Sequence, residues 1–222
     1  VACANASGYS AATHHLPAPQ FTVMSAILPA VASGRQSLRV LAGLSTETLY
    51  FFPRPPARRN GLKQLSKLFF QLRMQPFYLR RVLRSLGYRY GRFIERSHAF
   101  YDGLIKELCD HDQNIVRQLQ RKQPSTGATV LAIALSEQHF DRYILSGFSF
   151  ELTHAYADNP EIAQRKSKLS RHAETDITVM AYLAKKFGNV FTTEQTVHER
   201  AGIPFLPAVS EAGVAGSPMT ED

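Results

Sequence analysis

The sequence predicts an α/β protein built on an open, mostly parallel β-sheet with helices on both faces. Short apolar runs bounded by Gly, Pro and Ser alternate with stretches whose apolar residues recur at helical spacing. From residue 124 onward the predicted order is helix, strand, helix, strand, and such alternation is typical of α/β folds. In sheets of this kind ligands bind where the strands end, so we expect a site there.

The first half of the chain predicts three strands and a helical segment. Residues 1–4, 21–25 and 38–41 are short apolar runs separated by Gly-, Pro- or Ser-bearing connections, and we expect a buried strand at each. Leucines recur at helical spacing through residues 54–96, and Pro76 interrupts them. This pattern predicts two short basic amphipathic helices.

The middle of the chain predicts two further helices. Apolar residues spaced three and four apart over residues 97–121 predict one amphipathic helix. Ser125, Thr126 and Gly127 then precede the nearly uniform apolar run 128–135. We expect a buried helix there, with a hydroxyl residue at or near its N-cap.

The last third predicts strand, helix and strand. Residues 143–145 form a short hydrophobic strand that ends at Ser146 and Gly147. After a less regular stretch, residues 148–169, a helix carries Ile177, Met180, Ala181, Ala184 and Phe187 on one face, and Gly188 lies where a C-terminal cap belongs. Residues 190–192 predict one more strand.

Length and charge bound the organisation. With 222 residues, 44% of them hydrophobic and 20% charged, the chain has the composition of a globular protein rather than a disordered or fibrous one. We predict a single domain over residues 1–210, with a basic helical insertion at about 52–96, and a flexible tail at 211–222. Residues 54–96 hold twelve Lys or Arg and one acid, a local charge of +11, whereas the rest carries −3.

This basic segment admits several partners. It suits an anionic membrane surface, a nucleic-acid backbone or an anionic substrate, and equally the solvated face of a core-packing helix pair. No apolar run is long enough to predict a membrane-spanning helix. Cys3 and Cys109 define no disulfide framework, which favours a reducing compartment. The apolar start at Val1 leads us to expect upstream sequence.

Three groups of residues are candidates for chemistry. Asp110-His111-Asp112 matches a metal-binding spacing but lies within a predicted helix, so we interpret it as an exposed helix face. The turn at 125–127 places amides and a helix dipole where an anion can bind, although plain capping explains it equally. His172 and Asp176 share one helix face, and an imidazole held by a carboxylate can act as a general base.

Four motifs in the same order resemble one known family. They are Ser125-Thr126-Gly127 before an Ala-rich helix, Leu145-Ser146-Gly147-Phe148 closing a strand, Tyr156 in the following loop, and His172 before Thr175-Asp176-Ile177. Together they resemble the bacterial sialyltransferases of glycosyltransferase family 42 over residues 123–204. The chain departs from that pattern at Ser149 and Glu151, and the family's first strand and nucleotide loop are absent from it.

The resemblance implies a Rossmann-like domain, a variant of the GT-A architecture, that transfers sialic acid from a CMP-activated donor to a glycan hydroxyl with inversion and without a metal or other cofactor. It implies catalytic roles for two residues, with His172 removing the acceptor's proton and Tyr156 contacting the departing phosphate. Substrate-binding roles fall to Ser125, Thr126, Gly127, Ser146 and Gly147 of these motifs. Asn5, after the predicted strand at 1–4, resembles the asparagine that follows the family's second strand and faces the donor, so it is a further substrate-binding candidate.

The same resemblance leads to expectations about partners. We expect a nucleotide-sugar donor, a glycan or lipid-linked glycan acceptor, contact with an anionic membrane through the basic segment, and no nucleic acid, and we leave homo-oligomerisation open. The protein would be cytoplasmic, either free or peripheral on the inner face of the membrane. The alternatives are a noncatalytic basic peripheral membrane protein and an inactive relative of the family.

Overall fold

The computed structural model is an α/β protein and describes residues 1–53, 64–137, 140–148, 150 and 170–207. Four parallel strands form the main sheet in the spatial order β1-β2-β3-β4, and two further parallel strands pair with each other. The strands are β1 (Ala2–Ala4), β2 (Phe21–Ser25), β3 (Ser45–Phe52), β4 (Arg89–Glu95), β5 (Tyr143–Leu145) and β6 (Val190–Thr192). The parallel sheet with its helices is compatible with a Rossmann-like fold, as the sequence predicts.

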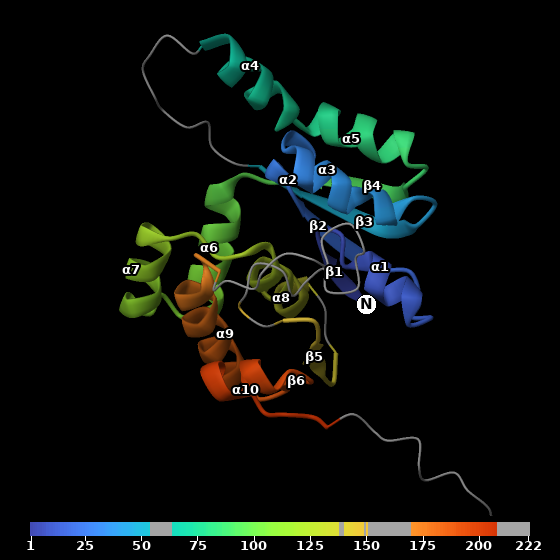
Figure 1. Ribbon diagram of the computed structural model, residues 1–222. Helices are drawn as coiled ribbons and strands as arrows, with labels where there is room; N and C mark the ends of the chain where they lie inside the picture. The colour runs from blue at the N-terminus through green and yellow to red at the C-terminus, as the bar shows by residue number, and fades with distance from the viewer. Residues whose placement is uncertain (54–63, 138–139, 149, 151–169, 208–222) are drawn as a thin grey trace, which may run out of the picture.

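Helices connect the strands and fill both sides of the main sheet (Figure 1). They are α1 (Gly8–Thr13), α2 (Ile27–Ala30), α3 (Ala32–Leu38) with a 3₁₀ turn at Arg39–Leu41, α4 (Gln64–Arg73), α5 (Pro76–Ser85), α6 (His98–Leu108), α7 (Gln113–Arg121), α8 (Thr126–Glu137), α9 (Ala173–Phe187) and α10 (Gln195–Ala201). Among the described residues no helix combines the length and apolar character needed to cross a membrane.

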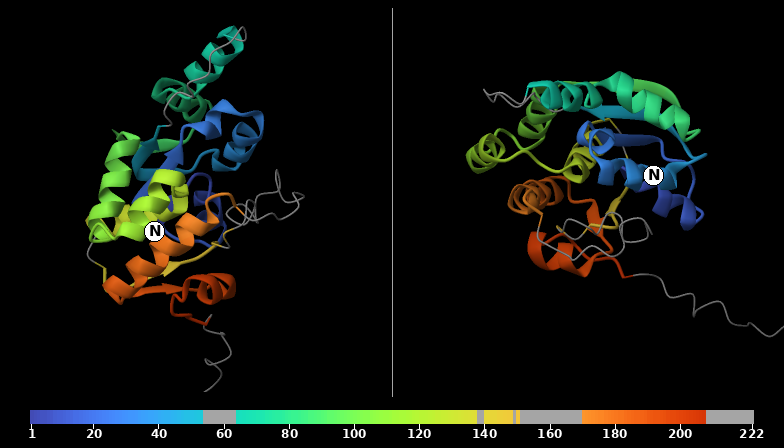
Figure 2. Two further views of the ribbon diagram at one scale, coloured as in Figure 1. Left: turned by 90° about the vertical axis from the view of Figure 1, so that its left-hand side faces the viewer. Right: turned by 45° about the horizontal axis from the view of Figure 1, so that its top comes forward.

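Strand alternation sends side chains to two different cores. Val23 and Phe52 face α6 and α8, where they pack in a cluster with Tyr101 and Ile133. Met24, Leu49 and Phe51 face the opposite side and pack with residues of α2, α3 and α5. Because the strands follow one another in order across the sheet, right-handed crossovers place α1 to α5 on one face. The other face is left for α6 and α8 (Figure 2).

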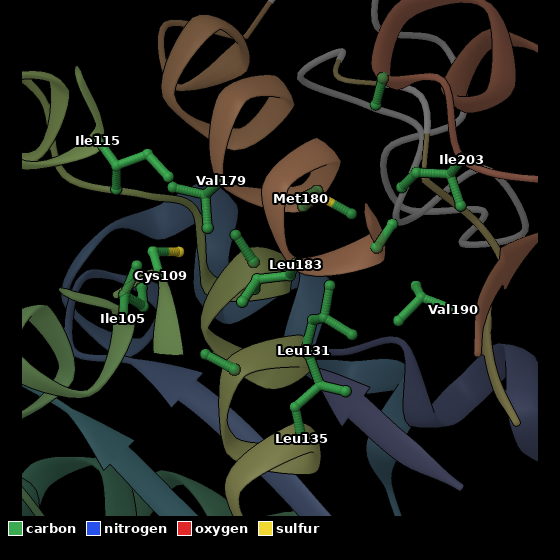
Figure 3. Packing of buried hydrophobic residues seen from close by; sticks show 14 of the residues in the cluster. Ile105, Cys109, Ile115, Leu131, Leu135, Val179, Met180, Leu183, Val190 and Ile203 are labelled. Carbon is green, nitrogen blue, oxygen red and sulfur yellow. The ribbon is translucent and has the colours of Figure 1, made fainter. Parts of the chain in front are cut away.

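A third core joins the second half of the chain. Leu131 and Leu135 of α8 pack against Val179, Met180 and Leu183 of α9, and residues of α6, α7 and α10 complete the cluster (Figure 3). Leu183 is fully buried, and truncating such a leucine to alanine typically costs about 2–5 kcal/mol. This core fixes the start of α8 beside the start of α9, which positions the site described below.

The structure confirms several predicted elements and corrects others. Strands 1–4, 21–25, 143–145 and 190–192 and the helices before and after Pro76 are present. The strand predicted at 38–41 is wrong: Leu38 and Leu41 are buried three residues apart, which suits the helical turn observed there. The strand in this region is β3, whose aromatic and β-branched residues are buried on both faces.

Two other predictions needed correction. The basic segment contains β4, which pairs with β3, so it is not helical throughout. The helix predicted over 97–121 is two helices, α6 and α7, because the chain turns at Asp110 and His111 with φ of 50° and 55°. Parts of the proposed insertion, residues 54–63, and the whole predicted tail 211–222 lie outside the described residues.

Candidate functional site

A cavity of about 620 Å³ lies between β1 and β5, where the carboxyl ends of β1, β2 and β3 meet the start of α8. The chain reaches this place by leaving β4 at one edge of the sheet and returning through α6, α7 and α8 to β5 near the other edge. Such a change of direction opens a crevice at the strand ends in α/β sheets. All the described residues that were predicted as site residues line this cavity, and Asp176 lines it as well: Asn5, Ser125, Thr126, Gly127, Ser146, Gly147, His172 and Asp176. Tyr156 lies outside the described residues.

The start of α8 is capped from within. The Ser125 hydroxyl accepts a hydrogen bond from the Ala128 amide at 3.3 Å, so the capping interpretation is confirmed. The Ser125 amide donates to Oδ1 of Asp176 at 2.7 Å. No acceptor among the described residues pairs with the amides of Thr126 and Gly127. Thr126 and Gly127 line the cavity, so the positive end of the helix dipole lies beside a space that can take an anion.

Asp176 is a buried carboxyl at the base of this cavity. Its side chain is only 1% exposed. Burial raises the pKa of the Asp176 carboxyl to about 7, against the opposing effect of the hydrogen bonds from Ser125. The sequence predicted Asp176 as the carboxylate that holds His172. The structure instead shows it binding the backbone at the start of α8, one element away.

His172 is held by a backbone carbonyl. It occupies the N-cap position of α9, and its Nδ1 lies 2.6 Å from the Gln123 carbonyl oxygen. A carbonyl oxygen only accepts, so Nδ1 carries the proton in this hydrogen bond. Nε2 is then an acceptor, and the Arg171 side chain donates to it from 3.3 Å. A ring in this tautomer can take up a proton at Nε2 once the Arg171 side chain releases that nitrogen, and proton uptake is the requirement for a general base.

Asn5 joins the ends of β1 and β2. It adopts a left-handed conformation with φ of 54°, which asparagine tolerates better than most residues. Its backbone N–H donates to the Val23 carbonyl at 2.7 Å, and its side-chain Oδ1 accepts from the backbone N–H of Ser25 at 3.0 Å. The side-chain oxygen is therefore used in holding the sheet. Asn5 contributes to the cavity wall from this fixed position.

Packing and backbone conformation explain the two glycines of the predicted site. A Cβ built on Gly127 would lie 2.1 Å from the Phe148 ring, so glycine is needed for that ring to cover the start of α8. Gly147 has a φ of 69°, and its amide donates to Oε1 of Glu194 at 2.7 Å. The sequence indicated an anion-binding turn at Gly127, and the resemblance implied a substrate-binding role for Gly147. The structure shows contacts within the chain.

The cavity also contains residues that the sequence did not indicate. Arg142 is the one Lys or Arg among the described lining residues, and Phe150 supplies apolar wall beside Phe148 of the strand-end motif. In the sequence, Arg142 reads as part of a turn before β5, and no spacing marks it as a ligand-binding residue. Its positive charge and the amides at the start of α8 give the cavity the character of an anion site.

The Asp110-His111-Asp112 motif has a structural role. It lies in the turn between α6 and α7, not within a helix as predicted. Asp110 pairs with Lys186 at 2.6 Å, and Asp112 caps α7 by accepting from the Asn114 and Ile115 amides. In the part of the chain that the structure describes, no three or more His, Cys, Asp and Glu side chains gather as metal ligands.

Comparison with known protein families, with curated proteins and with solved structures gave no match.

Proposed function

We propose that this protein is a glycosyltransferase that moves sialic acid, or a related sugar, from a CMP-activated donor to a glycan hydroxyl, with His172 as the general base. The observation that carries the proposal is the position of His172. Its Nδ1 is fixed on the Gln123 carbonyl, and its ring lines the same cavity as Thr126 and Gly127, whose amides have no acceptor among the described residues. A base and an anion-binding element in one crevice match the needs of this reaction.

The reaction requires removal of the acceptor's proton and binding of the negatively charged donor. The acceptor oxygen forms a bond to the anomeric carbon while the bond from that carbon to the phosphate oxygen breaks, and the electron pair leaves with CMP. His172 Nε2 accepts the proton that the acceptor hydroxyl loses, after the hydrogen bond from Arg171 to this nitrogen has been exchanged for one from that hydroxyl. The amides of Thr126 and Gly127 and the Arg142 guanidinium can bind a negatively charged group of the donor.

The finer fold assignment belongs to the same proposal. We propose that the sheet is a variant of the GT-A architecture and that α4 and α5 form a basic helical insertion in it. The proposal also assigns Tyr156 a hydrogen bond to the departing phosphate. Ser146 and Gly147 would shape the donor pocket at the end of β5, since both line the cavity.

Replacing His172 tests the proposal. We expect His172→Ala to lower transfer from radiolabelled CMP-sialic acid by about 100-fold or more, the usual contribution of a general base. The matched control is His198→Ala. His198 also makes an Nδ1 contact with a backbone carbonyl, at 2.8 Å from Ile203, but it does not line the cavity. Unchanged turnover by His172→Ala would remove this residue from the mechanism.

Binding separates this proposal from its rivals. CMP should raise the melting temperature of both the native chain and His172→Ala, because a ligand that binds only the folded state stabilises it. A native chain that gains no stability from CMP would contradict the assignment of the donor class. If the same chain bound anionic vesicles, the noncatalytic membrane-binding alternative would replace the glycosyltransferase.

A further inference from the structure

One face of α5 combines an exposed phenyl ring with arginines. Phe77, Arg80, Arg81 and Arg84 are spaced three, one and three residues apart, which puts them on one side of the helix. All four are exposed, with Phe77 58% exposed. On the opposite side Leu79 and Leu83 are fully buried against the sheet. The outward face of α5 therefore carries both apolar and charged side chains, in addition to the buried leucines that pack in the core.

The preceding helix, α4, adds a stripe of apolar side chains that is also exposed. Leu68, Phe69 and Leu72 lie at helical spacing and are 50%, 60% and 42% exposed. Both helices lie on the outside of the molecule, on the side of the sheet away from α8 (Figures 1 and 2). We call these seven side chains the α4–α5 surface: Leu68, Phe69, Leu72, Phe77, Arg80, Arg81 and Arg84.

The charge around this surface is positive and is not balanced by ion pairs. Arg73 and Arg89 are exposed nearby, at the end of α4 and the start of β4, and Glu95 is the one acid of β4. Among the described residues the one salt bridge joins Lys186 and Asp110, in another part of the molecule. Ordinary helices of a soluble domain expose polar side chains, so exposed phenyl and leucyl groups amid arginines point to a partner.

A shallow hollow in the same region is lined by three arginines. Arg80, Arg84 and Arg89 surround it together with Gly87, Tyr88 and Tyr90. The Arg80 guanidinium lies 4.0 Å from the centre of the Phe93 ring, a cation–π contact that holds one of the three cations in place. A phosphate group matches this arrangement, since arginine forks pair well with phosphate oxygens.

We propose that the α4–α5 surface binds an anionic lipid membrane, with the apolar side chains entering the headgroup boundary and the arginines binding lipid phosphates. Helices that carry Phe and Leu beside Lys and Arg lie in that boundary. Leucine and phenylalanine side chains favour an acyl environment over a nucleic-acid backbone, which they contact poorly. A twofold contact between two copies would place arginine against arginine, which disfavours self-association through this face.

This surface is separate from the cavity, so its test does not depend on transfer activity. We would measure flotation of the full chain with vesicles of phosphatidylcholine alone and of phosphatidylcholine with about 30% phosphatidylglycerol, because anionic lipid attracts basic residues near a membrane surface. We expect binding to the second vesicle only, and weaker binding as salt rises.

Matched variants identify the residues that carry the binding. Each arginine near an anionic surface contributes about a fivefold increase in partitioning, so Arg81→Ala with Arg84→Ala should weaken it by about 25-fold. The control, Arg117→Ala with Arg121→Ala, removes the same charge from exposed positions of α7 and should leave binding nearly unchanged. Phe69→Ala with Phe77→Ala should weaken it by at least about tenfold.

Other outcomes would overturn the proposal. Equal binding to both vesicles, or equal loss in the two arginine pairs, would show that the charge of this surface is not used. Displacement of the protein from vesicles by a single-stranded oligonucleotide at lower concentration than by lipid would assign the surface to nucleic acid. Loss of a dimer in the phenylalanine variant, measured by sedimentation, would assign it to a second copy of the chain. Circular dichroism verifies that each variant is folded.

Discussion

Asp176→Asn provides the sharpest test of the buried carboxyl at the cavity. Burial raises the pKa of Asp176 from an ordinary 3.8 to about 7, so the folded protein holds a proton that the unfolded chain has lost. The contribution of this group to the free energy of unfolding is therefore fully present below pH 4 and is lost as the pH rises to about 7. Asparagine resembles the protonated acid in shape and keeps an oxygen that can accept from the Ser125 amide.

The magnitude follows from the two pKa values. One pH unit within the window from about 4 to about 7 costs the native protein about 1.4 kcal/mol, which gives about 4 kcal/mol over the whole window as an upper value. We expect the unfolding free energies of native protein and Asp176→Asn to be similar at pH 4. The variant should become the more stable of the two as the pH rises, by about 3–4 kcal/mol at pH 8.

Urea unfolding at half-unit steps from pH 4 to pH 8 measures this difference. Other carboxyl groups titrate in the same range, but they are common to both proteins and cancel in the comparison. The control is Glu174→Gln, which removes one charge from an exposed position of the same helix and should give a nearly constant difference. A constant difference for Asp176→Asn as well would refute the argument, because it would show that the folded state does not hold the extra proton.

Two further predictions concern packing. Gly127→Ala places a Cβ 2.1 Å from the Phe148 ring, and such overpacking should lower the free energy of unfolding by about 1–3 kcal/mol, measured in urea. Adding Phe148→Ala should recover part of the loss, and no loss in the single variant would contradict the described contact. On α5, Leu83→Ala should cost about 2–5 kcal/mol because Leu83 is fully buried. Phe77 is exposed, so Phe77→Ala should change the free energy of unfolding by no more than about 0.5 kcal/mol. Equal losses in Leu83→Ala and Phe77→Ala would contradict the assignment of Leu83 to the buried face of α5 and of Phe77 to the exposed face.

The sequence predicts best the elements whose own residues determine them. The apolar run 128–135 is buried and helical because few of its positions are polar, and α9 ends at Gly188 because that residue takes a φ of 70°. The short strands at 21–25 and 143–145 follow from apolar runs between turns. In each case the local pattern and the tertiary environment favour the same conformation.

Where the prediction failed, a neighbouring element decides the conformation. The sequence predicts that residues 89–95 belong to a basic helical segment. They form a strand instead, because they pair with the edge of β3. The turn at Asp110 and His111 depends on the capping of α7 by Asp112. The role of Asp176 was also not predictable from the sequence, since it depends on α8 and α9 starting side by side, which pairs Ser125 with Asp176, 51 positions apart in the chain.

The pairing of these two helix starts connects stability with ligand binding. Below pH about 7 Asp176 is protonated and adds no negative charge beside the amides of Thr126 and Gly127. Above that pH its carboxylate carries a charge at the same helix end that an incoming anion would use, and the two repel each other. The two effects therefore occupy successive pH ranges: the stabilisation from Asp176 is lost between about pH 4 and 7, and we expect the affinity of the proposed anion site to fall as the pH rises through about 7. Asp176→Asn removes the ionisable carboxyl, so the variant should lose both the pH dependence of stability and the pH dependence of anion affinity that this group causes.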